Sequence, residues 1–265
     1  METGTTADGS LFWRKIGKGK ALLVLHGWGS NSEVMTPVAS GLKDIRTFYI
    51  PDLPGFGNSS APGSPWSVDD YADAVEKFVN ENISESRIDL LVHSFGARIA
   101  LKLLTRQDFN NRIEKVVFTG AAGLKPKRKP LFYLKKYSAL LLKAPFYLLP
   151  GRARERGLAR LRQTALWKML GSSDYRSLSG VMRETFVKTV SEFLDPLLPT
   201  IEHEVLLIWG ENDTATPVEQ GRRMEKGLKN GTLILMKEAG HYAFHDQPSL
   251  FNSIVRAYLK PASQP

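Results

Sequence analysis

Short apolar stretches alternate along the chain with longer segments in which apolar residues recur every three or four positions. A short continuous apolar run predicts a buried strand, whereas the longer spacing predicts an amphipathic helix. The strands predicted in this way cover residues 12–16, 21–25, 47–50, 88–93, 113–119, 205–209 and 233–237. Gly17-Lys18-Gly19 separates the first two strands and predicts a hairpin turn between them.

Helical spacing follows most of these strands, at residues 35–42, 68–79, 95–104, 218–226 and 250–258. Ser67 and Asp70 form a capping-box pattern at the start of the second helix. Strands that alternate with helices predict an α/β fold, here a mostly parallel, doubly wound sheet. The alternation stops between residues 124 and 201, where the pattern is helical, basic and interrupted by prolines. We therefore expect a core at 1–123 and 202–265 with a helical cap inserted at 124–201.

The composition excludes several kinds of catalytic and metal site and indicates where the protein is located. The 265 residues contain no cysteine, which excludes disulfides, thiolate catalysis and cysteine-rich metal sites. Residues 1–10 are small, polar and acidic, unlike a secretory signal. The longest mainly apolar run, 137–149, contains Lys143 and Pro145 and is too short to span a bilayer. These features predict a cytoplasmic protein.

The net charge of +9 is concentrated in the predicted cap. Residues 125–168 hold 13 Lys or Arg against Glu155 alone, a charge of +12, which leaves the remainder of the chain at −3. Such a block indicates a surface with a role separate from the core. One interpretation is an amphipathic lid whose apolar side roofs a pocket while its charges are solvated. The other is that the lid contacts anionic lipid or admits anionic substrates. No motif indicates nucleic-acid binding.

In a parallel sheet, ligands bind beyond the carboxyl ends of the strands. His26-Gly27-Trp28-Gly29 follows one such end, and its glycines leave backbone N–H groups, Trp28 N–H above all, free to face a ligand. Ser94 follows residues 88–93 and begins a helix, with Phe95 N–H beside it. Asp213 follows residues 205–209, and His241 follows the last strand. A nucleophile, an acid and a base thus occur in the chain order Ser, Asp, His.

Each of these residues has an alternative. The nucleophile elbow is a sharp strand-to-helix turn with the pattern G-x-S-x-G, in which the serine is exposed. Here the pattern retains only Gly96 and has Val92 in place of the first glycine, so Ser94 also suits a simple helix N-cap. His245 competes with His241 as the base, and Glu211 competes with Asp213 as the acid. A β-branched Val92 could widen the elbow and reduce activity.

Taken together, these loops and Asp52-Leu53-Pro54-Gly55-Phe56-Gly57 resemble the α/β-hydrolase superfamily over essentially the whole chain. The resemblance implies a catalytic triad of Ser94, Asp213 and His241, and an oxyanion hole formed by the N–H groups of Trp28 and Phe95. It implies no metal or organic cofactor. The expected substrate contacts are His26, Gly27, Trp28, Phe132 and Tyr137.

The function that the resemblance favours is a serine esterase acting on small-molecule carboxylic esters of small to medium acyl chains. Thioester, lactone and carbon–carbon bond hydrolysis use the same machinery. A different class is a ligand-binding or signalling protein that keeps the pocket without turnover. Asp52 is expected to brace its loop, and His26 also suits a hydrogen-bonded structural role.

Overall fold

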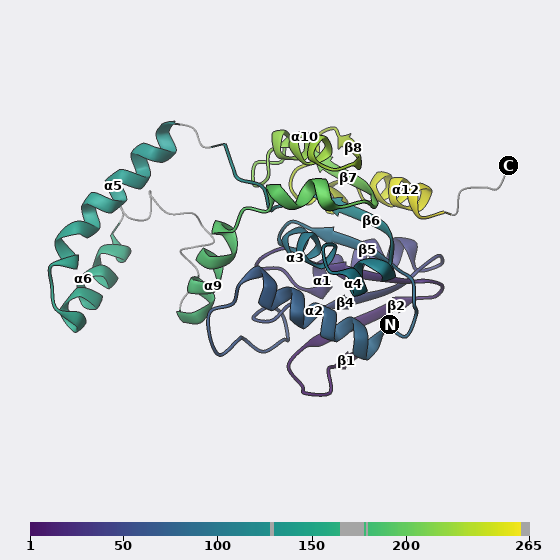
Figure 1. The fold of residues 1–265 in the computed structure, drawn as a ribbon, viewed down its shortest axis with the longest axis horizontal. Helices are drawn as coiled ribbons and strands as arrows, with labels where there is room; N and C mark the ends of the chain where they lie inside the picture. Colours follow the sequence, from purple (N-terminus) through teal and green to yellow (C-terminus); the bar gives the residue numbers. More distant parts are fainter. Residues whose placement is uncertain (128–129, 165–177, 179, 261–265) are drawn as a thin grey trace.

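A computed structural model describes residues 1–127, 130–164, 178 and 180–260. Its centre is an eight-stranded sheet in the order β1-β2-β4-β3-β5-β6-β7-β8 (Figure 1). The pairs β1–β2 and β2–β4 are antiparallel, and all other neighbours are parallel. The strands are β1 (Glu2–Thr5), β2 (Phe12–Gly17), β3 (Ala21–Leu25), β4 (Thr47–Pro51), β5 (Ile88–His93), β6 (Ile113–Thr119), β7 (Glu204–Gly210) and β8 (Asn230–Met236).

Helices cover both faces of this sheet because its central strands are apolar on both sides. Alternate residues of β3 belong to two separate core clusters, Leu23 and Leu25 to one, Leu22 and Val24 to the other. The first cluster includes α2, α3 and Met224 of α10, and the second includes α1 and α12. The helices of this core are α1 (Ser32–Leu42), α2 (Val68–Asn82), α3 (Phe95–Leu103), α4 (Gln107–Arg112), α10 (Val218–Gly227), α11 (Ala243–Asp246) and α12 (Pro248–Leu259).

The predicted fold class, a mostly parallel doubly wound α/β sheet, is confirmed. The predicted strands 88–93 and 113–119 match β5 and β6 at both ends. The Ser67–Asp70 capping box is also confirmed, with Asp70 N–H donating to Ser67 Oγ and Ser67 N–H donating to Asp70. Strand β1 and the short helices α4 and α11 were not predicted, because each contains too few apolar residues to show the pattern of a strand or a helix.

The predicted hairpin at Gly17-Lys18-Gly19 is wrong. Strand β4 lies between β2 and β3, pairing antiparallel with β2 and parallel with β3. Gly17 is paired with Thr47, and Lys18 N–H donates to the carbonyl of Lys43 rather than closing a turn. Strands β2 and β4 are about thirty residues apart in the chain, and their pairing is decided by the packing of the whole sheet. A turn signal made of two glycines indicates only the local conformation of the chain.

The predicted cap segment contains α5 (Pro130–Tyr147), α6 (Gly151–Gln163), α9 (Gly180–Ser191) and the 3-10 helix η1 (Asp195–Thr200). Helices α5 and α6 lie side by side and project away from the sheet, whereas α9 lies next to the core (Figure 1). None of the helices in the described part of the chain combines the length and apolar character needed to cross a bilayer.

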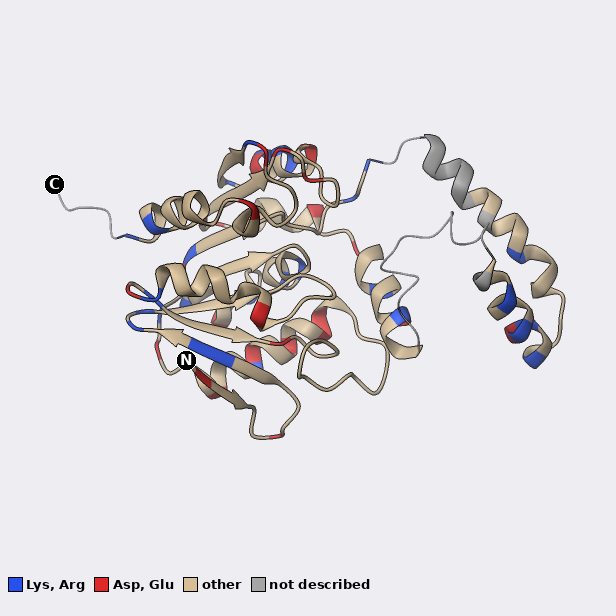
Figure 2. Ribbon diagram, turned by 180° about the vertical axis from the view of Figure 1, so that it is seen from behind, with Lys and Arg blue, Asp and Glu red and all other residues tan. Residues whose placement is uncertain are grey.

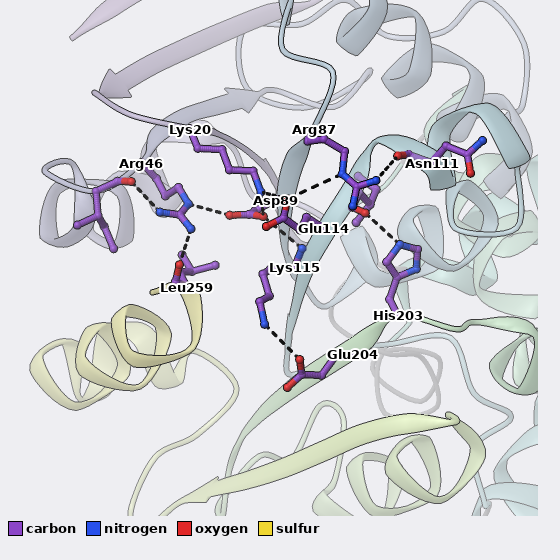
Figure 3. A network of polar contacts seen from close by, with 12 residues as sticks. Lys20, Arg46, Arg87, Asp89, Asn111, Glu114, Lys115, His203, Glu204 and Leu259 are labelled. Atoms are coloured by element: carbon purple, nitrogen blue, oxygen red, sulfur yellow. Dashed lines mark hydrogen bonds and ion pairs between the residues drawn. The ribbon is translucent and has the colours of Figure 1, made fainter. Parts of the chain in front are cut away.

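A buried ion-pair network ties the sheet together near the amino ends of its parallel strands (Figure 3). Asp89 of β5 is fully buried, and its carboxylate accepts hydrogen bonds from Lys20 Nζ at 2.9 Å and Arg46 Nε at 2.7 Å. The N–H of Lys115 in β6 donates to the same carboxylate at 3.2 Å. One side chain therefore joins β5 and β6 to the residues that precede β3 and β4.

We expect Asp89→Asn to lower the free energy of unfolding by about 3 kcal/mol, because it removes the fully buried charge that pairs with Arg46 and, together with Glu114, with Lys20. Urea denaturation monitored by tryptophan fluorescence measures this change. Asp44→Asn is the matched control: Asp44 pairs with Arg256 at the surface, with a side chain 57% exposed, and its loss should leave stability near that of wild type. Equal stability of the Asp89→Asn variant and wild type would contradict the prediction.

Candidate active site

Ser94 stands at the sharp turn between β5 and α3. Its backbone has φ 50° and ψ −108°, an unfavourable conformation for a residue with a side chain. Ser94 N–H donates to the carbonyl of Thr119, and Ser94 O accepts from Ala97 and Ala122, so neighbouring backbone holds this conformation. Ser94 occupies the N-cap position of α3, yet its hydroxyl makes no capping hydrogen bond. The N-cap interpretation of this serine is therefore wrong.

The hydroxyl of Ser94 instead lies 3.0 Å from Nε2 of His241. Nδ1 of His241 lies 2.8 Å from Oδ2 of Asp213. The three residues come from three different strand-end loops, and the parallel order β5-β6-β7-β8 brings those loops to one edge of the sheet. The arrangement can move a proton from a hydroxyl to an imidazole whose far side faces a carboxylate.

Asp213 is held as an anion by its surroundings. Burial by itself would raise the pKa of this carboxyl, but hydrogen bonds from His241 and Thr216 outweigh burial and lower the pKa below its ordinary value. Oδ1 accepts from the N–H groups of Ala215 at 2.9 Å and Thr216 at 2.8 Å, and Oδ2 accepts from the Thr216 hydroxyl at 2.8 Å. Every one of these partners favours the charged form, which is the form that stabilises an imidazolium.

Two glycines are required by close contacts around the elbow. A Cβ at Gly96 would lie 2.5 Å from the carbonyl oxygen of Leu25, and a Cβ at Gly27 would lie 2.9 Å from Nδ1 of His93. Val92 meets no comparable restriction. It lies inside β5, paired with Leu25 and Phe118, and its side chain fills the core rather than the turn. The first glycine of the elbow pattern is therefore dispensable in this packing.

The N–H groups of Trp28 and Phe95 are free to act as donors near Ser94. Among the described residues neither amide donates to another part of the chain. Phe95 is the first residue of α3, where an N–H has no partner within its own helix. The Trp28 ring packs against Phe95 and Phe186 with centroids 5.1 and 5.0 Å apart, which fixes the loop that carries its amide. Their role as an oxyanion hole stays a prediction.

A cavity of about 400 Å³ opens beside the Ser94 hydroxyl. Its wall combines polar groups of the core loops with apolar side chains of α9. The residues that line it are Gly27, Trp28, His93, Ser94, Phe95, Arg98, Ala122, Phe186, Val190, Ala215, Thr216, His241 and Tyr242. Among the side chains that the structure describes, those of α9 and not those of α5 therefore supply the cap's share of this wall.

Two of the expected substrate contacts, His26 and Tyr137, fall elsewhere. His26 is fully buried below the loop, where its Nε2 accepts from Leu53 N–H at 2.9 Å and burial lowers its pKa to about 4. Tyr137 lies on α5 with 56% of its surface exposed and does not line the cavity. Both were expected at the wall, and the structure corrects both placements. Phe132 belongs to α5, but its side chain lies outside the described residues.

The competing acid and base lie away from Ser94. Glu211 and His245 are both exposed, and neither lines the cavity. Asp52 is buried and accepts from Ser32 N–H and Asn58 N–H at 2.5 and 2.9 Å, so it braces its loop as predicted. The described residues contain no group of three His, Cys, Asp or Glu side chains suited to hold a metal.

Arg98 was not predicted, and it joins the site to the cap. From α3 its guanidinium donates to the carbonyls of Thr189 at 3.0 Å and Glu192 at 2.6 Å, at the carboxyl end of α9. Burial lowers the pKa of Arg98 to about 10, which leaves it a cation that complements the negative end of the α9 dipole. A single arginine in a helical pattern gives no sequence signal for such a contact.

His93 supports the loop that carries the base. Its Nε2 donates to the carbonyl oxygen of His241 at 3.1 Å, and the two rings lie 4.7 Å apart. Burial and the neighbouring His241 together lower the pKa of His93 to about 3. His93 thus stays neutral in the folded protein at pH 5 and above.

The lowered pKa of His93 predicts that the folded protein is less stable in acid. Below pH 6.5 the unfolded chain protonates His93 while the folded chain does not, so the free energy of unfolding falls as the pH decreases. Replacing His93 with phenylalanine should make that fall shallower by about 1 kcal/mol per pH unit between pH 6 and 5. Urea titrations at a series of pH values measure the slope. Parallel slopes for the variant and wild type would refute the shift.

A doubly wound sheet with a serine at the elbow after its central strand is the architecture of α/β hydrolases. A family model described as the alpha/beta hydrolase fold matches residues 20–248. The chain belongs to this family.

Its relatives include several kinds of hydrolase. A pimeloyl-[acyl-carrier protein] methyl ester esterase of Neisseria meningitidis is 23% identical, over 91% of this chain and 94% of its own. A 2-hydroxy-6-oxononadienedioate/2-hydroxy-6-oxononatrienedioate hydrolase of Escherichia coli is 24% identical, over 88% of this chain and 82% of its own. The solved structure of an esterase from Exiguobacterium antarcticum superposes with a TM-score of 0.71 at 21% identity, over 98% of this chain and 99% of its own.

Proposed function

We propose that this hydrolase is a serine esterase that cleaves carboxylic esters through an acyl-enzyme on Ser94. The observation that carries the proposal is the continuous contact from hydroxyl to imidazole to carboxylate, 3.0 Å and 2.8 Å long, in a cavity large enough for a small substrate. Esterases among its relatives support the same class.

The reaction follows from the positions of these groups. Ser94 Oγ forms a bond to the ester carbonyl carbon as Nε2 of His241 takes the hydroxyl proton, and the carbonyl electron pair moves to oxygen. The N–H groups of Trp28 and Phe95 stabilise that oxyanion. The carbon–oxygen bond to the alcohol then breaks, and the alcohol leaves with the proton from His241. Water attacks the acyl-enzyme by the same route and releases the acid, restoring Ser94.

The cavity favours small to medium acyl chains. Its volume of about 400 Å³ is at the lower end of the usual range for small-molecule sites. Trp28, Phe95, Phe186 and Val190 give it apolar walls, which suit an acyl chain better than a charged one.

Carbon–carbon bond hydrolysis is the second candidate, and one observation favours it. The Escherichia coli relative acts on an oxo-diene diacid, and its similarity to this chain is as high as that of the esterase. Arg98 lines the cavity as a buried cation and could attract a carboxylate there. The α9 carbonyls already occupy its guanidinium, so the ester remains the favoured substrate.

Turnover of p-nitrophenyl esters from acetate to palmitate tests the proposal. The competing substrate is 2-hydroxy-6-oxononadienedioate, the diene diacid in the name of the Escherichia coli relative. We expect kcat/KM to be highest for chains of about two to eight carbons and to fall for longer ones. No hydrolysis of any ester, together with saturable binding of such esters, would favour a receptor instead. Faster cleavage of the diene diacid would assign the second candidate.

A further inference from the structure

Helix α5 carries an unpartnered apolar stripe. Apart from Pro145, the exposed apolar residues of its described turns, with Leu148 directly after the helix, recur at intervals of three and four, which places them along one side of the helix. They are Tyr137, Leu140, Leu141, Ala144, Tyr147 and Leu148, with Leu141 73% and Leu148 89% exposed. Residues 137–149 hold six of the twelve exposed large apolar side chains in the described part of the chain. We call these six residues, five in α5 and Leu148 directly after it, the α5 stripe.

The opposite side of α5 already has its partner. Leu142 and Phe146 are half-buried there, and the Phe146 ring lies so close to Gly157 of α6 that a Cβ would overlap it. The α5 stripe therefore faces away from α6. Helices α5 and α6 together stand clear of the sheet layers (Figure 1), so the core does not cover the stripe either.

The neighbouring helix supplies unpaired positive charge. Arg152, Arg154, Arg156 and Arg160 of α6 are all exposed, against Glu155 alone (Figure 2). Within the described ranges none of these four guanidinium groups forms a salt bridge. Several cations of the core are paired instead, since Lys102, Arg106, Arg223 and Arg256 each contact a carboxylate within 3 Å.

Cationic and apolar groups also meet in one groove. A groove of about 640 Å³ between α5 and α6 is lined by Phe146 and Leu149 together with Arg156 and Arg160. Guanidinium groups bind phosphate oxygens, and the adjacent ring and leucine accept acyl carbon. This combination matches the boundary between lipid headgroups and acyl chains.

We propose that the α5–α6 hairpin is a membrane-docking element that lies in the plane of an anionic bilayer surface. Burial of the α5 stripe in the acyl boundary supplies hydrophobic energy, and the α6 arginines meet anionic headgroups. Helix α9 is the next described helix along the chain, and its Phe186 lines the cavity beside Ser94. Resting on the proposed esterase function, the inference adds that acyl substrates reach the site from the membrane surface.

Vesicle co-sedimentation of the full chain tests the docking without reference to catalysis. The vesicles are pure phosphatidylcholine, or phosphatidylcholine with one quarter phosphatidylglycerol. We expect the protein to bind the anionic vesicles at least about tenfold more tightly than the neutral ones, and to lose this preference as salt screens the charges. Ser94→Ala should bind as wild type does, so a failure of the esterase proposal would leave this result unchanged.

Two double variants separate the contribution of the α5 stripe from that of the α6 arginines. Leu141→Glu with Leu148→Glu, and Arg154→Glu with Arg156→Glu, should each weaken binding to anionic vesicles by about tenfold or more. The matched controls, Leu250→Glu and Arg222→Glu, change exposed residues of α12 and α10 and should bind normally. Circular dichroism and hydrolysis of a soluble ester verify that every variant is folded.

Three outcomes would overturn the proposal. The first is equal binding to neutral and anionic vesicles. The second is binding that survives both double variants. The third is no vesicle binding by wild type, accompanied by self-association that Leu141→Glu with Leu148→Glu abolishes, which would make the α5 stripe an interface between copies of this chain.

Discussion

Replacing Ser94 with alanine is expected to lower kcat/KM for a p-nitrophenyl ester by roughly 10⁴-fold or more, because no other nucleophile lies at the elbow. The loss should fall on kcat, since the cavity walls that bind the acyl chain are unchanged. Stopped-flow and steady-state assays of both proteins measure the effect. Stability should not decrease, because the serine hydroxyl makes no capping bond and the alanine fits the same turn.

Covalent labelling provides an independent measurement. A fluorophosphonate should add one phosphonyl group to Ser94 of wild type, located by peptide mass spectrometry, and should leave Ser94→Ala unlabelled. Ser59 is a suitable control, because it lies in the loop after β4, away from the elbow, and its hydroxyl donates to the Asp52 carbonyl. It should stay unmodified. Ester turnover that survives Ser94→Ala would refute the assignment of the nucleophile.

Replacing Asp213 with asparagine is expected to lower kcat by roughly 10³- to 10⁴-fold with little change in fold. The hydrogen bonds at this carboxylate give the reason. Oδ1 accepts two backbone N–H groups, from Ala215 and Thr216, so the oxygen of an asparagine must take that position. Its NH₂ group would then face Nδ1 of His241, which would have to accept a hydrogen bond instead of donating one. The imidazole would be left in the tautomer whose Nε2 cannot take the serine proton.

Glu211→Gln is the matched control, because it removes a carboxylate two residues away that is exposed and does not contact His241. It should retain wild-type kcat. The Asp213→Asn variant should still react with a fluorophosphonate, but more slowly in proportion to its kcat. If Asp213→Asn kept more than a tenth of wild-type kcat, the carboxylate would not be orienting the base.

Much of this site could be predicted, because the sequence patterns that indicate it lie within short segments of the chain. Each strand of the central sheet is a short apolar run, and the residue after it is identified by counting along the chain. Ser94, Asp213 and His241 each follow such a run, and parallel pairing places all three loops at one edge. The oxyanion donors were predicted in a similar way, because Trp28 lies in the loop after a strand and Phe95 is the first residue of a helix.

The errors have a common physical origin, which is that they concern contacts between distant segments. The turn at Gly17 looked like a hairpin because nothing local reveals that β4 inserts between β2 and β3. Tyr137 looked like a lining residue because an apolar face on a cap helix suits either a pocket roof or an outer surface. Arg98 gave no signal, because its partners are backbone carbonyls about ninety residues away.

The sequence by itself determined the order of strands and helices, the concentration of positive charge between residues 125 and 168, and the three side chains of the site. These depend on periodicity and on position relative to a strand end, which each segment carries in its own residues. Only the tertiary structure decided the order of strands in the sheet, the choice of α9 as the cavity wall and the exposure of α5. Those features depend on which apolar surfaces find partners once the whole chain has packed, and no segment specifies its partner alone.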